Sequence, residues 1–180
     1  EVIAHTIIEE RLKADTIEEA VCEAMNRIKG AYSMVIMSPQ KLIAARDENG
    51  FRPLCYGKTA NGEYVVASES CSLDSVGAEF IRDIEKGEIV VFGKDGITSI
   101  KKHCNKSKQT LCVFEYIYFA RPDSIIDGKN VYEARIKAGE ILAKENPVNA
   151  DIVVGVPDSG LDAALGYSKA SGIPYEKGAR

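Results

Sequence analysis

Hydrophobic and polar positions alternate between a helical and a strand period over most of the first hundred residues. Apolar residues recur at helical spacing from Ile17 to Ile28, between a capping box of Thr16 with Glu19 and a stop at Gly30, and they predict a helix. Short apolar runs separated by turn residues then predict strands at 32–37, 42–45, 54–56, 64–67, 88–92 and 97–100, with a helical turn near 73–77. This order predicts an antiparallel sheet with helices on its faces.

The pattern changes after the polar segment 103–109, HCNKSKQ, which we interpret as a linker with a domain boundary in it or just after it. Beyond it, Asn130 and Glu133 predict the start of a second long helix that runs to about Lys144. A buried strand and another helix follow. Such an order is typical of a βαβ unit with parallel strands.

The apolar run Ile152–Val156 has no alternating polar residue, which predicts a strand covered on both faces, as in a parallel sheet. It enters the turn Pro157–Gly160, and apolar residues at helical spacing then predict a helix that Gly172 ends. A strand that enters a polar, glycine-containing turn before a helix presents backbone N–H groups that favour a phosphate. The alternative is an ordinary turn in which Asp158 or Ser159 caps the helix.

Composition restricts the class of protein. Of 180 residues, 45% are hydrophobic and 28% are charged, which is typical of a globular protein. The net charge of −4 gives no general attraction to nucleic acid or an anionic membrane, so a polyanionic ligand needs a local site. We also find no apolar run near the ~18 residues of a membrane span and no pattern typical of a signal peptide. The five cysteines are odd in number and form no CxxC pair, which favours reduced, mostly buried thiols and a cytoplasmic location.

Two further stretches have alternative interpretations. In RDENGFRPL, Arg46 and Arg52 flank a turn at Asp47, and the segment is either a salt-bridged loop that holds two strands or a ligand contact. Residues 67–70, ASES, predict a strand end and a cap.

The segment 112–124, CVFEYIYFARPDS, places four aromatic residues within six positions, together with Glu115 and Arg121. This mixture predicts an inter-domain surface, where rings bury area while hydroxyls and charges find partners. Binding of single-stranded nucleic acid is the alternative, but it would require surrounding basic residues, and these are few.

Taken together, the runs RDENGFRPL, ASESCSLDSVGAEFIRD, EKGEIVV, FEYIYFARPDS and GVPDSG closely resemble the glutamine phosphoribosylpyrophosphate amidotransferases, or amidophosphoribosyltransferases, over essentially the whole chain. The resemblance implies an α+β N-terminal-nucleophile domain of the class II glutamine amidotransferases, with residues 1–109 as its C-terminal part. Residues 110–180 would be an inter-domain segment followed by the start of an α/β type I phosphoribosyltransferase domain.

The resemblance also implies an activity: ammonia released from glutamine displaces pyrophosphate from phosphoribosylpyrophosphate to give 5-phosphoribosylamine, the first step of de novo purine (IMP) biosynthesis. We expect these two small molecules as partners, no nucleic acid or membrane, and a homo-oligomer when the protein is complete. The family's nucleophile is an N-terminal cysteine, whereas this chain begins with Glu1. We therefore expect an inactive fragment, cut at both ends, that contains no catalytic residue.

In the second domain, the resemblance implies that Asp158, Ser159 and Gly160 bind the pyrophosphate end of the substrate and that Ser159 is a Mg²⁺ ligand. Cys112 matches the position of one thiolate of the [4Fe–4S] cluster that some members carry, and a buried structural thiol is the alternative. Two other functions stay open: a regulator with the phosphoribosyltransferase fold that binds phosphoribosylpyrophosphate without catalysis, and another class II amidotransferase of the asparagine synthetase type.

Overall fold

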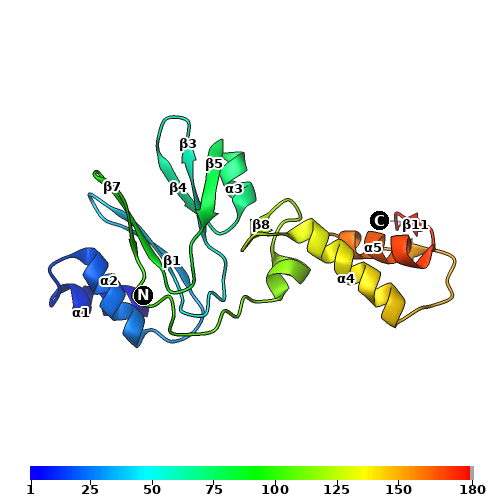
Figure 1. Ribbon diagram of the computed structural model, residues 1–180, viewed down its shortest axis with the longest axis horizontal. Helices are drawn as coiled ribbons and strands as arrows, with labels where there is room; N and C mark the ends of the chain where they lie inside the picture. Colours follow the sequence, from blue (N-terminus) through cyan, green and yellow to red (C-terminus); the bar gives the residue numbers. More distant parts are fainter. Residues whose placement is uncertain (179–180) are drawn as a thin grey trace. The chain divides into compact units, whose positions relative to one another are not determined.

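The computed structural model describes residues 1–178, and contacts between residues divide the chain into two compact units. The first unit comprises residues 1–68 and 72–112, and the second comprises residues 69–71 and those from 113 onward. Each unit is described by itself below, with the element labels of Figure 1. Within residues 1–178, none of the helices combines the length and the apolar character that crossing a bilayer requires.

The first unit contains two antiparallel sheets, in which the strands follow the orders β1-β2-β6-β7 and β4-β3-β5 (Figure 1). Its elements are α1 (Val2–Arg11), α2 (Ile17–Arg27), β1 (Ser33–Met37), β2 (Leu42–Arg46), β3 (Cys55–Thr59), β4 (Tyr64–Ala67), β5 (Ala78–Asp83), β6 (Ile89–Gly93) and β7 (Gly96–Ile100), together with α3 (Ser70–Ser75), which begins in the second unit.

The central strands β2 and β6 of the four-stranded sheet are buried on both faces, and alternate residues of β2 enter different hydrophobic clusters. Ile43 and Ala45 pack with Val21 and Met25 of α2, whereas Ala44 packs in a cluster with Tyr56 of the second sheet. The prediction of one antiparallel sheet with helices on its faces is therefore wrong in part, since the second sheet covers one face. The uninterrupted apolar sequence of β2 and β6 indicates burial on both sides but does not say what covers each side.

The helices that the sequence predicts correctly are those with local signals at their ends. The Thr16 capping box is present, with the Thr16 side chain accepting from the Glu19 N–H while the Glu19 carboxylate accepts from the Thr16 N–H. The sequence pattern predicts neither strand β5 nor helix α1. The apolar residues of α1 do not lie on one face, because Ile7 is buried while Val2 and Ile8 are exposed, so no helical stripe marks it.

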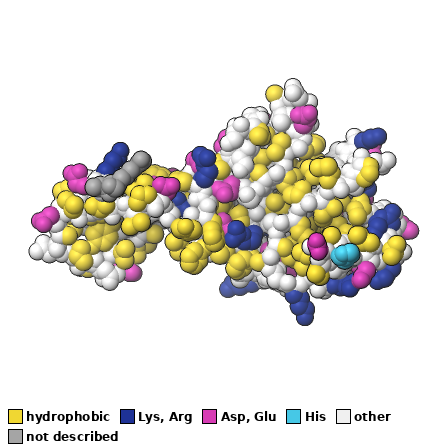
Figure 2. All heavy atoms as spheres, turned by 180° about the vertical axis from the view of Figure 1, so that it is seen from behind, with side chains coloured by type: hydrophobic (Ala, Val, Ile, Leu, Met, Phe, Trp, Pro, Cys, Tyr) yellow, Lys and Arg dark blue, Asp and Glu magenta, His cyan; other side chains and the backbone are white. Residues whose placement is uncertain are grey.

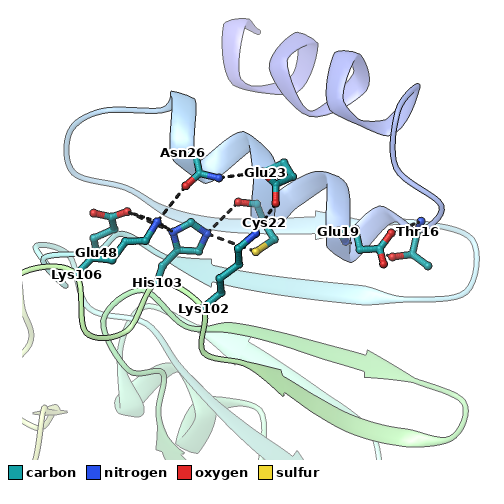
Figure 3. A network of polar contacts seen from close by, with 9 residues as sticks. All are labelled: Thr16, Glu19, Cys22, Glu23, Asn26, Glu48, Lys102, His103 and Lys106. Atoms are coloured by element: carbon teal, nitrogen blue, oxygen red, sulfur yellow. Dashed lines mark hydrogen bonds and ion pairs between the residues drawn. The ribbon is translucent and has the colours of Figure 1, made fainter.

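The segment 103–109 is not simply a polar linker, because its first residue is fully buried against α2 (Figure 3). His103 Nε2 lies 3.0 Å from the carbonyl oxygen of Cys22, and its Nδ1 lies 2.8 Å from Lys106 Nζ and 3.3 Å from Glu48. Burial also raises the pKa of the Cys22 thiol, which disfavours the reactive thiolate form. All five cysteines are free, and all except Cys112 are buried, as predicted.

The second unit is organised by two helices that cross closely. Gly139 of α4 and Gly166 of α5 lie at the crossing, where an added Cβ at either position would come within 3.0 Å of backbone atoms of the other helix. The elements of this unit are a five-residue π-helix η1 (Glu115–Phe119), β8 (Ile125–Ile126), β9 (Lys129–Asn130), α4 (Val131–Glu145), β10 (Val153–Val154), α5 (Gly160–Ser171) and β11 (Tyr175–Glu176).

Both predicted helices of this unit are confirmed. Helix α4 begins where Asn130 Oδ1 accepts from the Glu133 N–H, and helix α5 ends at Gly172, whose φ is 78°. The predicted buried strand 152–156 is wrong in length and burial, since β10 has two residues and Val156 is 77% exposed. Its pairing with β11 is parallel, as predicted. Within the strand itself, Val154 is exposed.

Candidate functional site

The turn Pro157–Gly160 joins β10 to α5, and its residues are exposed or half-buried. Gly155 sets its position, because a Cβ there would lie 2.8 Å from Leu161 Cα, so the strand end rests directly on the first turn of α5. The Pro157–Asp158 peptide bond is cis. The N-terminus of a twelve-residue helix therefore opens at the surface beside the side chains of Asp158 and Ser159.

Of the backbone N–H groups in this turn, some are bonded within the turn and others are open to a ligand. The N–H of Gly160 donates to the Val156 carbonyl at 3.0 Å, and that of Leu161 donates to the Asp158 carbonyl at 3.3 Å. Within residues 1–178, the N–H groups of Asp158 and Ser159 donate to no carbonyl oxygen. Ser159 stands at the N-cap of α5, but its hydroxyl makes no capping hydrogen bond, so the predicted alternative of a cap is wrong for this side chain.

These donors are the ones that a diphosphate requires. The backbone of Asp158 and Ser159 and the Ser159 hydroxyl are available at a helix N-terminus, where an anion is favoured. The backbone N–H of Gly160 already donates to the Val156 carbonyl in this structure. It could donate to the substrate only after the turn changes its conformation. The roles of Asp158, Ser159 and Gly160 as substrate-binding residues stay predictions.

The same turn fits a Mg²⁺ ion that accompanies a diphosphate. Mg²⁺ prefers oxygen ligands and keeps substrate phosphates and water in its coordination shell. The Ser159 hydroxyl and the neighbouring exposed Asp158 carboxylate supply oxygen atoms that no capping bond occupies. The donor set therefore suits this ion.

Cys112 does not form part of a metal site with its neighbours. It is half-buried, and its N–H donates to the carbonyl oxygen of Phe51 at 3.0 Å. Nowhere in residues 1–178 do three or more His, Cys, Asp or Glu side chains come together as metal ligands would. Because a four-iron cluster normally takes four thiolates, the described residues alone do not fit one.

The RDENGFRPL segment is a structural loop built on a buried arginine. Arg46 is 1% exposed and donates to the carbonyl oxygens of Arg52, Ile84 and Gly50 at 2.8 to 3.0 Å. The buried carboxylate of Asp47 accepts from backbone N–H groups of the same loop, including that of Phe51 at 3.0 Å. Of the two interpretations, the loop that holds strands together is supported, although it works mainly through backbone carbonyls.

The aromatic segment contains the π-helix η1, in which Tyr116 is half-buried and its hydroxyl donates to the Ile126 carbonyl at 2.9 Å. The inter-domain surface proposed for these rings stays a prediction. The exposed rings are those of Phe114, Tyr118 and Phe119, each at least 50% exposed, and Glu115 points inward instead. Figure 2 shows that hydrophobic side chains gather at several places on the face that it draws.

Sequence reasoning missed the role of Glu69 and Ser70, which it interpreted as a strand end and a cap. Glu69 Oε2 accepts from the Arg121 N–H at 2.9 Å and from the Ser124 hydroxyl at 2.7 Å, and Ser70 Oγ accepts from the Ile125 N–H at 2.8 Å. Two consecutive side chains thus hold the ARPDSI segment. The only sequence signal was a carboxylate between two serines at the end of a strand.

Comparison with known proteins shows which class of protein this chain is similar to. A family model described as a glutamine amidotransferase domain matches residues 1–75. Together with the two antiparallel sheets, this match confirms that residues 1–75 are part of a glutamine amidotransferase domain.

Individual proteins that are similar to this chain indicate a particular family within that class. The chain is 48% identical over 178 residues to the amidophosphoribosyltransferase of Staphylococcus aureus (strain Mu50), covering 99% of this chain and 35% of that protein. It is also 48% identical over 182 residues to the amidophosphoribosyltransferase of Rhizobium etli, covering 99% of this chain and 36% of that protein. The chain is therefore related to the amidophosphoribosyltransferases, which confirms the resemblance, and it spans about a third of the length of these curated relatives.

Solved structures agree. Glutamine phosphoribosylpyrophosphate amidotransferase from B. subtilis, complexed with ADP and GMP, matches with a TM-score of 0.91 and 45% identity over 98% of this chain and 38% of that one. A structure described as that of the allosteric regulatory enzyme of purine biosynthesis matches with a TM-score of 0.90 and 44% identity, covering 98% and 37%. Both matches extend beyond the amidotransferase unit into the second unit.

Proposed function

We propose that the full-length protein that carries this sequence transfers ammonia from glutamine to phosphoribosylpyrophosphate, giving 5-phosphoribosylamine and pyrophosphate in the first step of purine biosynthesis. One observation carries the proposal: similarity to amidophosphoribosyltransferases at 48% identity runs through both units, including the turn that ends β10. An amidotransferase unit and a turn suited to a diphosphate are the two parts that this reaction needs.

In this proposal the second unit is the start of a type I phosphoribosyltransferase domain, and its turn holds the leaving group. The backbone N–H groups of Asp158 and Ser159 and the Ser159 hydroxyl would hydrogen-bond the diphosphate, with the N-terminus of α5 favouring its negative charge. Bound Mg²⁺, with the Ser159 hydroxyl among its ligands, would neutralise part of that charge. Holding the departing pyrophosphate lowers the barrier to its displacement at the ribose carbon.

Residues 1–180 alone would catalyse neither half of the reaction in this proposal. The four buried cysteines are inaccessible to glutamine, and the half-buried Cys112 has no histidine or carboxylate cluster around it within the described residues. Cys112 as a ligand of a [4Fe–4S] cluster, a homo-oligomeric full-length protein and a cytoplasmic location are kept as further proposals. Iron analysis, light scattering and cell fractionation of the full-length protein test these three in turn.

The proposal is tested by measuring pyrophosphate release by the full-length protein with phosphoribosylpyrophosphate, Mg²⁺ and either glutamine or ammonium as nitrogen donor. We expect release with both donors. Binding of phosphoribosylpyrophosphate without release would contradict the proposal and favour a regulator, and an ATP requirement would favour an amidotransferase of the asparagine synthetase type.

A matched pair of variants tests the turn. Ser159→Ala removes a hydrogen bond to a charged ligand, worth about 1.5–3 kcal/mol, so the half-saturating phosphoribosylpyrophosphate concentration should rise roughly 10- to 150-fold. Ser171→Ala, at the other end of α5, should leave it unchanged. If Ser159→Ala leaves the dependence on Mg²⁺ and phosphoribosylpyrophosphate untouched, the assignment of Ser159 is wrong.

A further inference from the structure

Arg135, on α4, is a buried arginine that holds both ends of the π-helix η1. Its side chain is 4% exposed. Nε donates to the Tyr116 carbonyl at 2.7 Å, and Nη2 donates to the Ala120 carbonyl at 2.7 Å. Because the guanidinium group is planar and rigid, these two bonds fix the π-helix and the arginine relative to each other.

The remaining guanidinium nitrogen faces a carboxylate on another helix. Arg135 Nη1 lies 3.7 Å from Asp162 Oδ2, which is too long for a hydrogen bond but close enough for an ion pair. This oxygen is buried, and within residues 1–178 it has no hydrogen-bond partner. An unpartnered buried carboxylate oxygen beside an arginine can gain a charge-assisted hydrogen bond through a small movement.

Asp162 also lies where ligand binding would affect it. It is in the first turn of α5, three residues after Ser159, on the helix whose N-terminus opens at the Pro157–Gly160 turn. A diphosphate bound at that turn brings negative charge to the same end of the helix. Repulsion by this charge favours an approach of the Asp162 carboxylate to Arg135, and charges interact more strongly in a buried environment than in water.

We propose that Arg135 is a positioning residue that couples binding of a diphosphate at the Pro157–Gly160 turn to the π-helix Glu115–Phe119. A closer Asp162 carboxylate attracts the guanidinium and changes its bonds to the Tyr116 and Ala120 carbonyls, because one rigid group makes all three interactions. The inference rests on the proposed function only in that the turn binds a diphosphate. It adds a set of contacts through which ligand binding at that turn changes the π-helix that bears the exposed aromatic rings.

Hydrogen exchange of the full-length protein, with and without Mg²⁺ and phosphoribosylpyrophosphate, tests this coupling. In the unchanged protein we expect the ligand to slow exchange at residues 156–161 and also at 115–120, where coupling of the usual size corresponds to roughly 5- to 150-fold. In Asp162→Asn, which keeps the shape but removes the charge, only residues 156–161 should respond. Asp162→Glu restores a carboxylate and should restore the response at 115–120.

Lys137→Gln is the matched control on α4, since Lys137 pairs with Glu140 on the exposed side of the helix, and it should respond like the unchanged protein. The quantity to compare between variants is the ratio of exchange rates without and with ligand. A loss of stability alone would alter both rates equally and leave this ratio unchanged. A full response at 115–120 in Asp162→Asn, or protection of 156–161 without any at 115–120 in the unchanged protein, would overturn the coupling but leave the proposed function intact. No protection of 156–161 in any protein would refute the diphosphate site and the coupling with it.

Discussion

The crossing of α4 and α5 allows a test in which two physical effects predict opposite signs. Gly139 lies in the interior of α4, and in an exposed helix interior replacement of glycine by alanine stabilises by about 1 kcal/mol. Here, however, an alanine Cβ would lie 2.8 Å from the Tyr167 nitrogen and closer still to the Ala163 carbonyl oxygen. These are backbone atoms of α5, so the two helices would have to separate.

Overpacking of this kind costs about 1–3 kcal/mol, and the upper end applies because no side chain can turn away to make room. After subtraction of the gain in helix propensity, we expect Gly139→Ala to destabilise the second unit by about 2 kcal/mol. The effect should appear as roughly 30-fold faster native-state hydrogen exchange of the protected amides of α4 and α5. Exchange is the suitable assay because it assigns the change to these helices in a chain with two units.

Gly160→Ala is the control, since its Cβ would meet nothing closer than Val156 Cβ at 3.7 Å. It should leave exchange unchanged or slow it by up to roughly fivefold. Slower exchange in Gly139→Ala would refute the reasoning, because it would show that propensity alone decides and that the helices do not cross as closely as described.

Three further predictions concern stability. Thr16→Ala should cost about 1 kcal/mol in urea unfolding, because it removes half of the capping box; an unchanged midpoint would contradict this. Burial acts to raise the pKa of Glu88, but hydrogen bonds, chiefly from Arg82, outweigh it and lower the pKa, so Glu88 stabilises above its usual pKa of 4.5 and this stability is lost as pH falls through the lowered value. Glu88→Gln should therefore cost about 2 kcal/mol at pH 7 and flatten the acid side of the stability curve, which unfolding at several pH values measures. Glu69→Ala should release residues 121–125, and hydrogen exchange of the Arg121 amide, which donates to Glu69, should become faster than in Glu79→Ala, whose side chain is exposed; equal exchange rates would refute the role of Glu69.

The sequence predicted those elements whose signals are local. The helix from Ile17 and the helix from Val131 each begin at a capping residue whose bond to the third helical N–H is present in the structure. The end of α5 at Gly172 follows from the positive φ that glycine adopts at low cost. Such features depend on residues only a few positions apart, so a sequence pattern can indicate them.

Long-range partners could not be predicted in the same way. The burial of His103 depends on the carbonyl oxygen of Cys22, 81 residues away, whereas the polar residues around it in the sequence indicate only a linker. Likewise, Glu69 meets Ser124 across 55 residues. The Pro157–Gly160 turn was predictable because strand, turn and helix adjoin in sequence, whereas the pairing of Asp162 with Arg135 depends on how α4 and α5 cross.

The central claim is that a turn after a two-residue parallel strand holds a diphosphate in a protein that also carries a glutamine amidotransferase domain. Diffraction from crystals of the full-length protein grown with Mg²⁺ and phosphoribosylpyrophosphate tests it most directly. The account predicts density for the diphosphate within hydrogen-bond distance of the Asp158 and Ser159 N–H groups and the Ser159 hydroxyl. A diphosphate bound elsewhere, with the turn making no contact to it, would contradict the account.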